Sequence, residues 1–151
     1  MMVAPLGNSR VAEILLVEDN PDDVFFTREA LDSARVRVNL HHVDNGLKCL
    51  QFLRKQNEYA DVPSPDLILL DMHMPQMNGF EVLNVIVSDE RLCHIPVVVL
   101  TTSSEASDIQ KMYKLRCNAY LTKPVNFDDF TKVIAQLTDF WFSLVILPRT
   151  D

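Results

Sequence analysis

The chain has 151 residues, of which 48% are hydrophobic, 23% are charged and only 3 are glycine. This length and composition are typical of one folded domain and exclude a disordered or collagen-like chain. The 14 lysines and arginines against 21 aspartates and glutamates give a formal net charge of −7, so we expect neither nucleic acid nor a membrane as a partner.

The cysteines and the N-terminal residues indicate a cytoplasmic protein. Cys49, Cys93 and Cys117 show no Cys-x-x-Cys spacing, which favours reduced thiols without a zinc or redox role. Residues 1–9 lack the apolar stretch of a secretory signal, and no apolar run approaches the ~20 residues of a membrane helix.

The first predicted unit is a strand followed by a helix. Residues 13–17 form a short apolar run, which is typical of a strand buried on both faces of a parallel sheet. Asn20, Pro21 and two aspartates then supply an N-cap, a proline at the first helical position and acids in the first turn. This pattern predicts a helix with candidate core positions at Val24, Phe25, Ala30 and Leu31.

The same alternation continues along the chain. Further strands are predicted at residues 37–43, 66–71, 95–100 and 119–122, and further helices at 45–57, 79–88, 105–115 and from 126 to near 140. The second helix has candidate core positions at Leu47, Leu50, Phe52 and Leu53. The last helix carries an apolar stripe at helical spacing, which indicates core packing of Phe130, Val133, Ile134, Leu137, Trp141 and Leu144.

Strands that alternate with helices in this way predict an α/β fold, in which a five-stranded parallel sheet has five helices distributed over its two faces. The pattern Gly-x-Gly-x-x-Gly of dinucleotide-binding folds does not follow the first strand. We therefore expect the flavodoxin-like, doubly wound arrangement with strand order 2-1-3-4-5, in which sites lie outside the carboxyl ends of the strands.

Those carboxyl ends carry a set of reactive side chains: Glu18 and Asp19, then Asp71, Thr101 and Lys123. Each has an ordinary explanation alone, such as a helix cap or a solvated charge, but together the carboxylates repel each other and need a cation. Oxygen ligands suit Mg2+, and a carboxylate such as Asp71 can accept a phosphoryl group as an acyl phosphate. Lys123 would offset the phosphoryl charge, and Thr101 would hydrogen-bond the phosphoryl oxygens.

This set resembles the receiver domains of bacterial response regulators, and the resemblance covers residues 13–137. Three dipeptides belong to the same resemblance: Met74-Pro75, Asn78-Gly79 and Lys123-Pro124. It implies that Asp71 accepts a phosphoryl group from a histidine kinase. It also implies that Mg2+, for which Mn2+ or Ca2+ can substitute, is held by Glu18, Asp19, Asp71 and the backbone carbonyl of His73.

The resemblance further implies a conformational switch. Thr101 and Thr102 would contact the phosphoryl group together with Lys123, and Tyr120 would swing inward when Thr101 moves. Pro124 would fix the lysine loop through a cis peptide bond from Lys123.

A narrower resemblance concerns residues 57–65 and the ending with Trp141-Phe142 and Leu147-Pro148. These segments are similar to those of response regulators that pair with cyanobacterial phytochromes. The implied partner is therefore a histidine kinase that is a bacteriophytochrome or a cyanobacterial phytochrome.

The predicted domain organisation leaves no room for an effector domain, so the output is expected to be protein–protein contact. We expect a flexible N-terminus at residues 1–10, a receiver domain at 11–140 and an apolar C-terminal extension at 141–151 that contacts a second copy in a homodimer. The expected interface residues are Phe140, Trp141, Phe142, Val145 and Ile146. The alternative is a tail that packs on its own domain.

Two other functions compete with a phosphoacceptor switch that is not an enzyme. A Mg2+-dependent phosphohydrolase with an aspartate nucleophile usually has a second aspartate two residues later, where this chain has His73. A pseudo-receiver, which binds partners without phosphorylation, usually lacks one of the acids or the lysine, and this chain has them all.

Overall fold

A parallel sheet in the order β2-β1-β3-β4-β5 forms the centre of the protein. The structure is a computed structural model that describes residues 11–144. The strands of this part of the chain are β1 (Ala12–Val17), β2 (Val38–Val43), β3 (Leu67–Leu70), β4 (Val97–Thr101) and β5 (Ala119–Thr122). The predicted flavodoxin-like strand order is confirmed.

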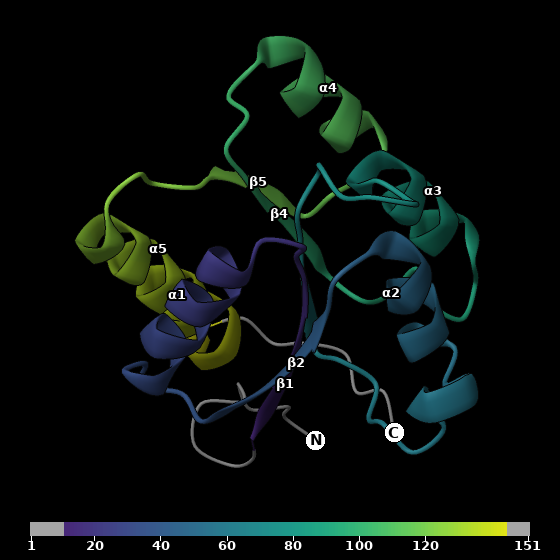
Figure 1. Ribbon diagram of the computed structural model, residues 1–151, viewed down its shortest axis with the longest axis horizontal. Coiled ribbons are helices and arrows are strands. Elements are labelled where there is room, and N and C mark those ends of the chain that lie inside the picture. Colours follow the sequence, from purple (N-terminus) through teal and green to yellow (C-terminus); the bar gives the residue numbers. More distant parts are fainter. Residues whose placement is uncertain (1–10, 145–151) are drawn as a thin grey trace.

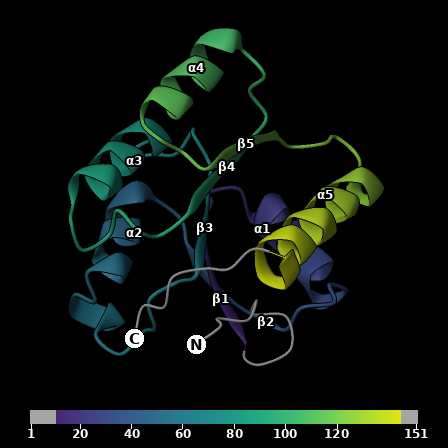
Figure 2. The same cartoon turned by 180° about the vertical axis from the view of Figure 1, so that it is seen from behind.

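Helices cover both faces of the sheet (Figures 1 and 2). On one side lie α1 (Pro21–Asp32) and α5 (Phe127–Asp139), and on the other lie α2 (Gly46–Leu53), α3 (Gly79–Ser88) and α4 (Ala106–Lys114). Two shorter segments accompany them, the 3-10 helix η2 (Asn57–Tyr59) and the π-helix η3 (Phe140–Leu144) that continues α5. Among residues 11–144, no helix is long and apolar enough to cross a membrane.

Asparagine side chains start four of these helices. Asn20, Asn45, Asn78 and Asn126 each accept a hydrogen bond from a backbone N–H of the following turn, and Asn78 forms a reciprocal capping box with Glu81. Such a cap stabilises a helix by about 1 kcal/mol because it satisfies an otherwise unpaired donor. Because these caps depend on local sequence, the predicted helix starts agree closely with the observed ones.

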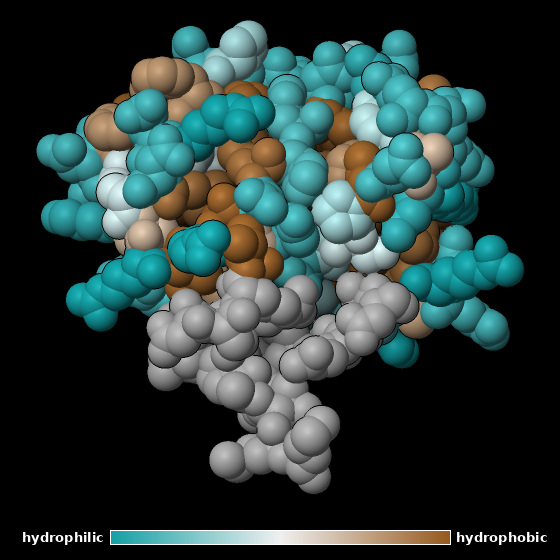
Figure 3. Space-filling model, turned by 90° about the horizontal axis from the view of Figure 1, so that it is seen from below, coloured by the Kyte–Doolittle hydropathy of each residue, from teal (hydrophilic) through white to brown (hydrophobic). Residues whose placement is uncertain are grey.

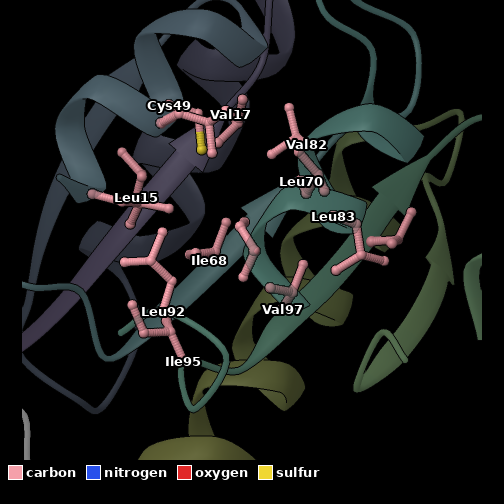
Figure 4. Packing of buried hydrophobic residues seen from close by; sticks show 14 of the residues in the cluster. Leu15, Val17, Cys49, Ile68, Leu70, Val82, Leu83, Leu92, Ile95 and Val97 are labelled. Carbon is pink, nitrogen blue, oxygen red and sulfur yellow. The ribbon is translucent and has the colours of Figure 1, made fainter. Parts of the chain in front are cut away.

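The hydrophobic core has two layers, one on each side of the sheet. Alternate residues of a strand point to opposite faces, so Leu15 and Val17 of β1 join the layer under α2 and α3, while Ile14 and Leu16 join the layer under α1 and α5. Figure 4 shows the first layer, in which side chains of β1, β3 and β4 meet those of α2 and α3. Every residue of β3 and β4 is buried, as expected for central strands of a parallel sheet.

Two predicted core positions are wrong. Phe25 is 56% exposed and Leu47 is 50% exposed. Leu47 lies about 200° around α2 from the buried Cys49, because each residue turns a helix by about 100°. Helix α2 also ends at Leu53 instead of continuing to residue 57, and Lys55 and Asn57 adopt positive φ angles that an α-helix does not contain.

The segment after α5 differs from its prediction at Phe142. This side chain is fully buried in the core layer under α1 and α5, whereas an exposed dimer contact was expected. Helix η3 turns Phe142 inward, while Phe140 stays 53% exposed and Trp141 is partly buried. Val145, Ile146 and the predicted flexible residues 1–10 lie outside the described residues.

The surface seen from below in Figure 3 is mainly hydrophilic, with hydrophobic residues exposed in smaller patches. Across the described part of the chain, the large hydrophobic side chains with substantial exposure are Phe25, Leu47, Tyr113, Val125, Phe127 and Phe140. They are spread over several helices and loops.

Candidate functional site

The sheet brings the predicted site residues to one edge. Glu18 and Asp19 follow β1, Asp71 follows β3, Thr101 ends β4 and Lys123 follows β5. Backbone hydrogen bonds link these strand ends, from Asp71 N to Val17 O at 3.1 Å and from Lys123 N to Thr101 O at 2.7 Å. The prediction that these residues meet at the carboxyl edge is therefore confirmed by the geometry.

Three carboxylates form a cluster at this edge. Glu18, Asp19 and Asp71 each offer an oxygen, and these oxygens lie within 4.8 Å of one another. Glu18 and Asp71 are buried, while Asp19 is exposed. Burial and, second, the neighbouring Asp71 raise the pKa of Glu18 to about 7, which reflects the cost of burying a negative charge beside another one. This donor set fits a hard divalent cation that keeps water on its exposed side.

Lys123 supplies the positive charge of the site. Its buried ammonium donates hydrogen bonds to Glu18 Oε1 and, at 2.9 Å, to Asp23 Oδ2, and it lies 3.9 Å from Asp71 Oδ2. Burial lowers the pKa of Lys123, but the nearby acids Asp23, Asp71 and Glu18 together outweigh that effect and raise it overall. The lysine is therefore positively charged at neutral pH.

Asp23 is a site residue that the sequence analysis missed. Its position in the first turn of α1 was interpreted only as a helix-start acid, yet its side chain reaches Lys123. Asp23 follows Asp19 by four residues, but Asp19 lies before the N-cap Asn20, so this spacing is not a helical turn and gave no signal. The lysine partner, 100 residues away in the sequence, could not be inferred from that spacing.

Thr101 carries a hydroxyl that is buried and has no hydrogen-bond partner within the described residues. An unpaired buried hydroxyl costs roughly 1–3 kcal/mol, so it favours a ligand that can accept a hydrogen bond from it. The neighbouring Thr102 is exposed. Of the two threonines, Thr101 is therefore the one that lacks a hydrogen-bond acceptor.

Tyr120 connects β5 to the loop before α4. Its hydroxyl donates to Ser103 O at 2.8 Å and lies 3.3 Å from Met72 Sδ. Ser103 in turn donates to Asp108 Oδ2 at 2.7 Å, inside the first turn of α4. Burial raises the pKa of Tyr120, so its hydroxyl remains a neutral donor at physiological pH. These contacts form a continuous path from the sheet edge to α4.

The loop after β3 folds back closely on Asp71. Gly79 N donates to Met72 O at 2.9 Å, and a Cβ atom at Gly79 would lie 2.5 Å from Asp71 O. This approach explains why glycine follows Asn78. His73 is exposed in this loop, and the metal-ligand role of its carbonyl stays a prediction.

The predicted cis peptide bond between Lys123 and Pro124 is wrong. The described residues contain no cis peptide bond. The trans form is intrinsically favoured by about 0.5–1 kcal/mol before proline. In this trans conformation the Lys123 side chain makes its contacts with Glu18 and Asp23.

The sequence profile described as "Response regulator receiver domain" matches residues 14–135. The chain belongs to this family. The receiver is 42% identical over 135 residues to response regulator Rcp1 of Synechocystis sp.. This alignment covers 89% of this chain and 92% of Rcp1. It is also 35% identical over 128 residues to the probable methanogenesis regulatory protein FilR2 of Methanothrix harundinacea, covering 85% of this chain and 82% of FilR2.

Solved structures place the receiver near phytochrome response regulators. The phosphorylated cyanobacterial phytochrome response regulator RcpA matches it with a TM-score of 0.89 and 40% identity, over 93% of this chain and 100% of RcpA. The Mn2+-bound form of Rcp1 matches with a TM-score of 0.86 and 40% identity, over 91% of this chain and 99% of Rcp1. Members of the family act as phosphoacceptor switches that are phosphorylated on an aspartate and bind a divalent metal.

Proposed function

We propose that this receiver accepts a phosphoryl group on Asp71 from a histidine kinase, with Mg2+ as the metal, and signals by protein–protein contact. The observation that carries the proposal is the position of Asp71, beside the acids Glu18 and Asp19 and 3.9 Å from the ammonium of Lys123. This arrangement provides both the metal ligands and the fixed positive charge that phosphoryl transfer to a carboxylate requires.

In the proposed step, a carboxylate oxygen of Asp71 attacks the phosphorus of a phosphohistidine. A new O–P bond forms, the P–N bond breaks, and its electron pair returns to the imidazole nitrogen. Asp71 Oδ1 accepts a hydrogen bond from Met72 N at 2.9 Å, whereas Oδ2 has no hydrogen-bond partner among the described residues. Oδ2 is therefore the better placed nucleophile.

Glu18, Asp19, Asp71 and the His73 carbonyl would hold Mg2+, for which Mn2+ or Ca2+ would substitute. When bound, the metal supplies positive charge that offsets the repulsion between the carboxylates and the phosphoryl oxygens. The Mn2+ bound by the related Rcp1 supports a divalent metal at this edge.

The protein's own groups would then respond to the phosphoryl group. The unpaired hydroxyl of Thr101 would donate to a phosphoryl oxygen, with Thr102 beside it, and Lys123 would offset the added charge. A shift of Thr101 would draw Tyr120 inward, away from Ser103, and so release the contact that leads to α4.

The kinase partner and the assembly are part of the same proposal. Relatives named as phytochrome response regulators support a bacteriophytochrome or cyanobacterial phytochrome as the kinase.

A homodimer is supported by the exposed Phe140 next to an apolar chain end. Because Phe142 belongs to the core, the dimer is best tested with Phe140→Asp, which should lower the mass measured by light scattering without unfolding the domain. An unchanged mass would contradict an interface at Phe140.

The central experiment is incubation with acetyl phosphate and Mg2+, followed by intact-mass measurement. We expect one added phosphoryl group on the wild-type chain and none on Asp71→Asn. Continuous turnover of a small phosphoester would instead support the phosphohydrolase. No added mass on the wild type, or equal labelling of Asp71→Asn, would support a pseudo-receiver and contradict the proposal.

A further inference from the structure

Lys123 donates a hydrogen bond to Asp23. Asp23 belongs neither to the predicted sequence motifs nor to the carboxylate cluster, so its role in the site is unexplained so far. We propose that Asp23 is a positioning residue that keeps the ammonium of Lys123 from closing onto Asp71 before phosphorylation. This inference rests on the proposed function of Asp71.

The distances show which acids hold the lysine. Lys123 Nζ lies 2.9 Å from Asp23 Oδ2, inside the usual range for a charge-assisted hydrogen bond, and it also donates to Glu18. The 3.9 Å separation from Asp71 Oδ2 is too long for a hydrogen bond. The ammonium is therefore held by two acids next to a third, which stays available to react.

The backbone around Asp23 is fixed from both sides. Its N–H donates to the Asn20 cap at 3.4 Å, and its carbonyl accepts a hydrogen bond at 2.8 Å from the buried hydroxyl of Thr27. The Asp23 side chain is only 23% exposed, so water competes weakly for its bond with Lys123. The acid can thus hold the lysine at a defined place beside the sheet edge.

This placement bears directly on the nucleophile. If the charge of Asp23 were removed, Asp71 Oδ2 would be the nearest carboxylate oxygen, besides Glu18, to which the ammonium could move. A direct hydrogen bond from Lys123 would then occupy one of the two lone pairs of Oδ2, withdraw electron density from this oxygen and make it a weaker nucleophile. With Asp23 present, one of the three ammonium protons remains free for an incoming phosphoryl oxygen.

The test compares phosphorylation rates in acetyl phosphate at a Mg2+ concentration that saturates the wild type. Asp23→Asn should lower the maximum labelling rate roughly fivefold, a size typical of coupled charged neighbours. Asp22→Asn is the matched control, because Asp22 occupies the same turn of α1 but is exposed and makes no contact with Lys123. It should change the rate less than about twofold. Asp23→Glu, which keeps the charge, should restore most of the rate.

Several results would overturn the inference. An unchanged rate in Asp23→Asn would do so, as would equal slowing in Asp22→Asn. Slowing that disappears when Mg2+ is raised would assign Asp23 to metal binding instead of lysine positioning. These outcomes differ from failure of the proposed function, in which the wild-type chain itself is not labelled.

A second measurement does not depend on labelling. In a crystal structure of unphosphorylated Asp23→Asn, Lys123 Nζ should lie within hydrogen-bonding distance of Asp71 Oδ2. An ammonium that keeps its separation from Asp71 in this variant would contradict the inference.

Discussion

Glu18 accepts a hydrogen bond from Lys123 across 105 residues of sequence, and both side chains are buried. The pair does not neutralise the site, because Asp19, Asp23 and Asp71 lie beside it. The excess of negative charge makes the metal-free protein sensitive to the protonation of Glu18, whose pKa is raised to about 7 by burial and by Asp71.

We expect the metal-free protein to lose stability as Glu18 ionises. The pKa of Glu18 rises from 4.5 to about 7 on folding, so its stabilising contribution is present below pH 4.5 and is lost as the pH rises through 7. The loss should reach roughly 3 kcal/mol at most, from the size of this shift. Urea unfolding at several pH values, in chelator, measures it. The control is Glu18→Gln, which should lack this part of the pH dependence; identical curves would contradict the prediction.

Replacing Asp19 should weaken metal binding without harming the fold. Asp19→Asn removes one negative charge from the carboxylate cluster, and the Asp19 side chain is exposed. We expect the dissociation constant for Mg2+ to rise tenfold or more in titration calorimetry, by analogy with the roughly 10–100-fold effects of changes around metal sites. Asp22→Asn should leave the constant nearly unchanged. Equal affinities for Asp19→Asn and the wild type would exclude Asp19 as a ligand.

Alanine substitutions at Phe142 and Phe140 should differ sharply in their effect on the free energy of unfolding. Phe142→Ala leaves a cavity in the core layer under α5 and should lower the free energy of unfolding by about 3–5 kcal/mol. Phe140→Ala changes an exposed side chain and should alter it by only about 0.5 kcal/mol. Chemical denaturation of both variants at low protein concentration measures the difference. Similar losses would show that Phe142 is not a core residue.

Gly79→Ala should destabilise the loop that supports Asp71. Its Cβ would meet Asp71 O at 2.5 Å and Met72 Cα at 2.8 Å, and both are backbone atoms that cannot easily move. We expect a loss of about 1–3 kcal/mol in unfolding free energy, together with slower labelling of Asp71. Asn84→Ala on the exposed side of α3 is the control. A Gly79→Ala protein as stable as this control would contradict the close approach.

The secondary structure was largely predictable from sequence because its signals are local. The asparagine caps that start α1, α2, α3 and α5 lie within one turn of the backbone groups that they bind. The apolar runs of β1, β3 and β4 predict strands that are buried on both faces of the sheet. Alternation of such elements restricts the topology, and the topology brings Glu18, Asp71 and Lys123 to one edge.

Sequence alone thus predicted the strand order and the residues that meet at the carboxyl edge of the sheet, whereas tertiary structure decided which side chains touch. The lysine's contact with Asp23, the burial of Phe142 and the exposure of Leu47 each depend on how one helix is rotated and seated on the sheet. Periodicity identifies an apolar face, but it does not say where that face ends or which distant residue meets it. That information arises only when segments a hundred or more residues apart are packed together.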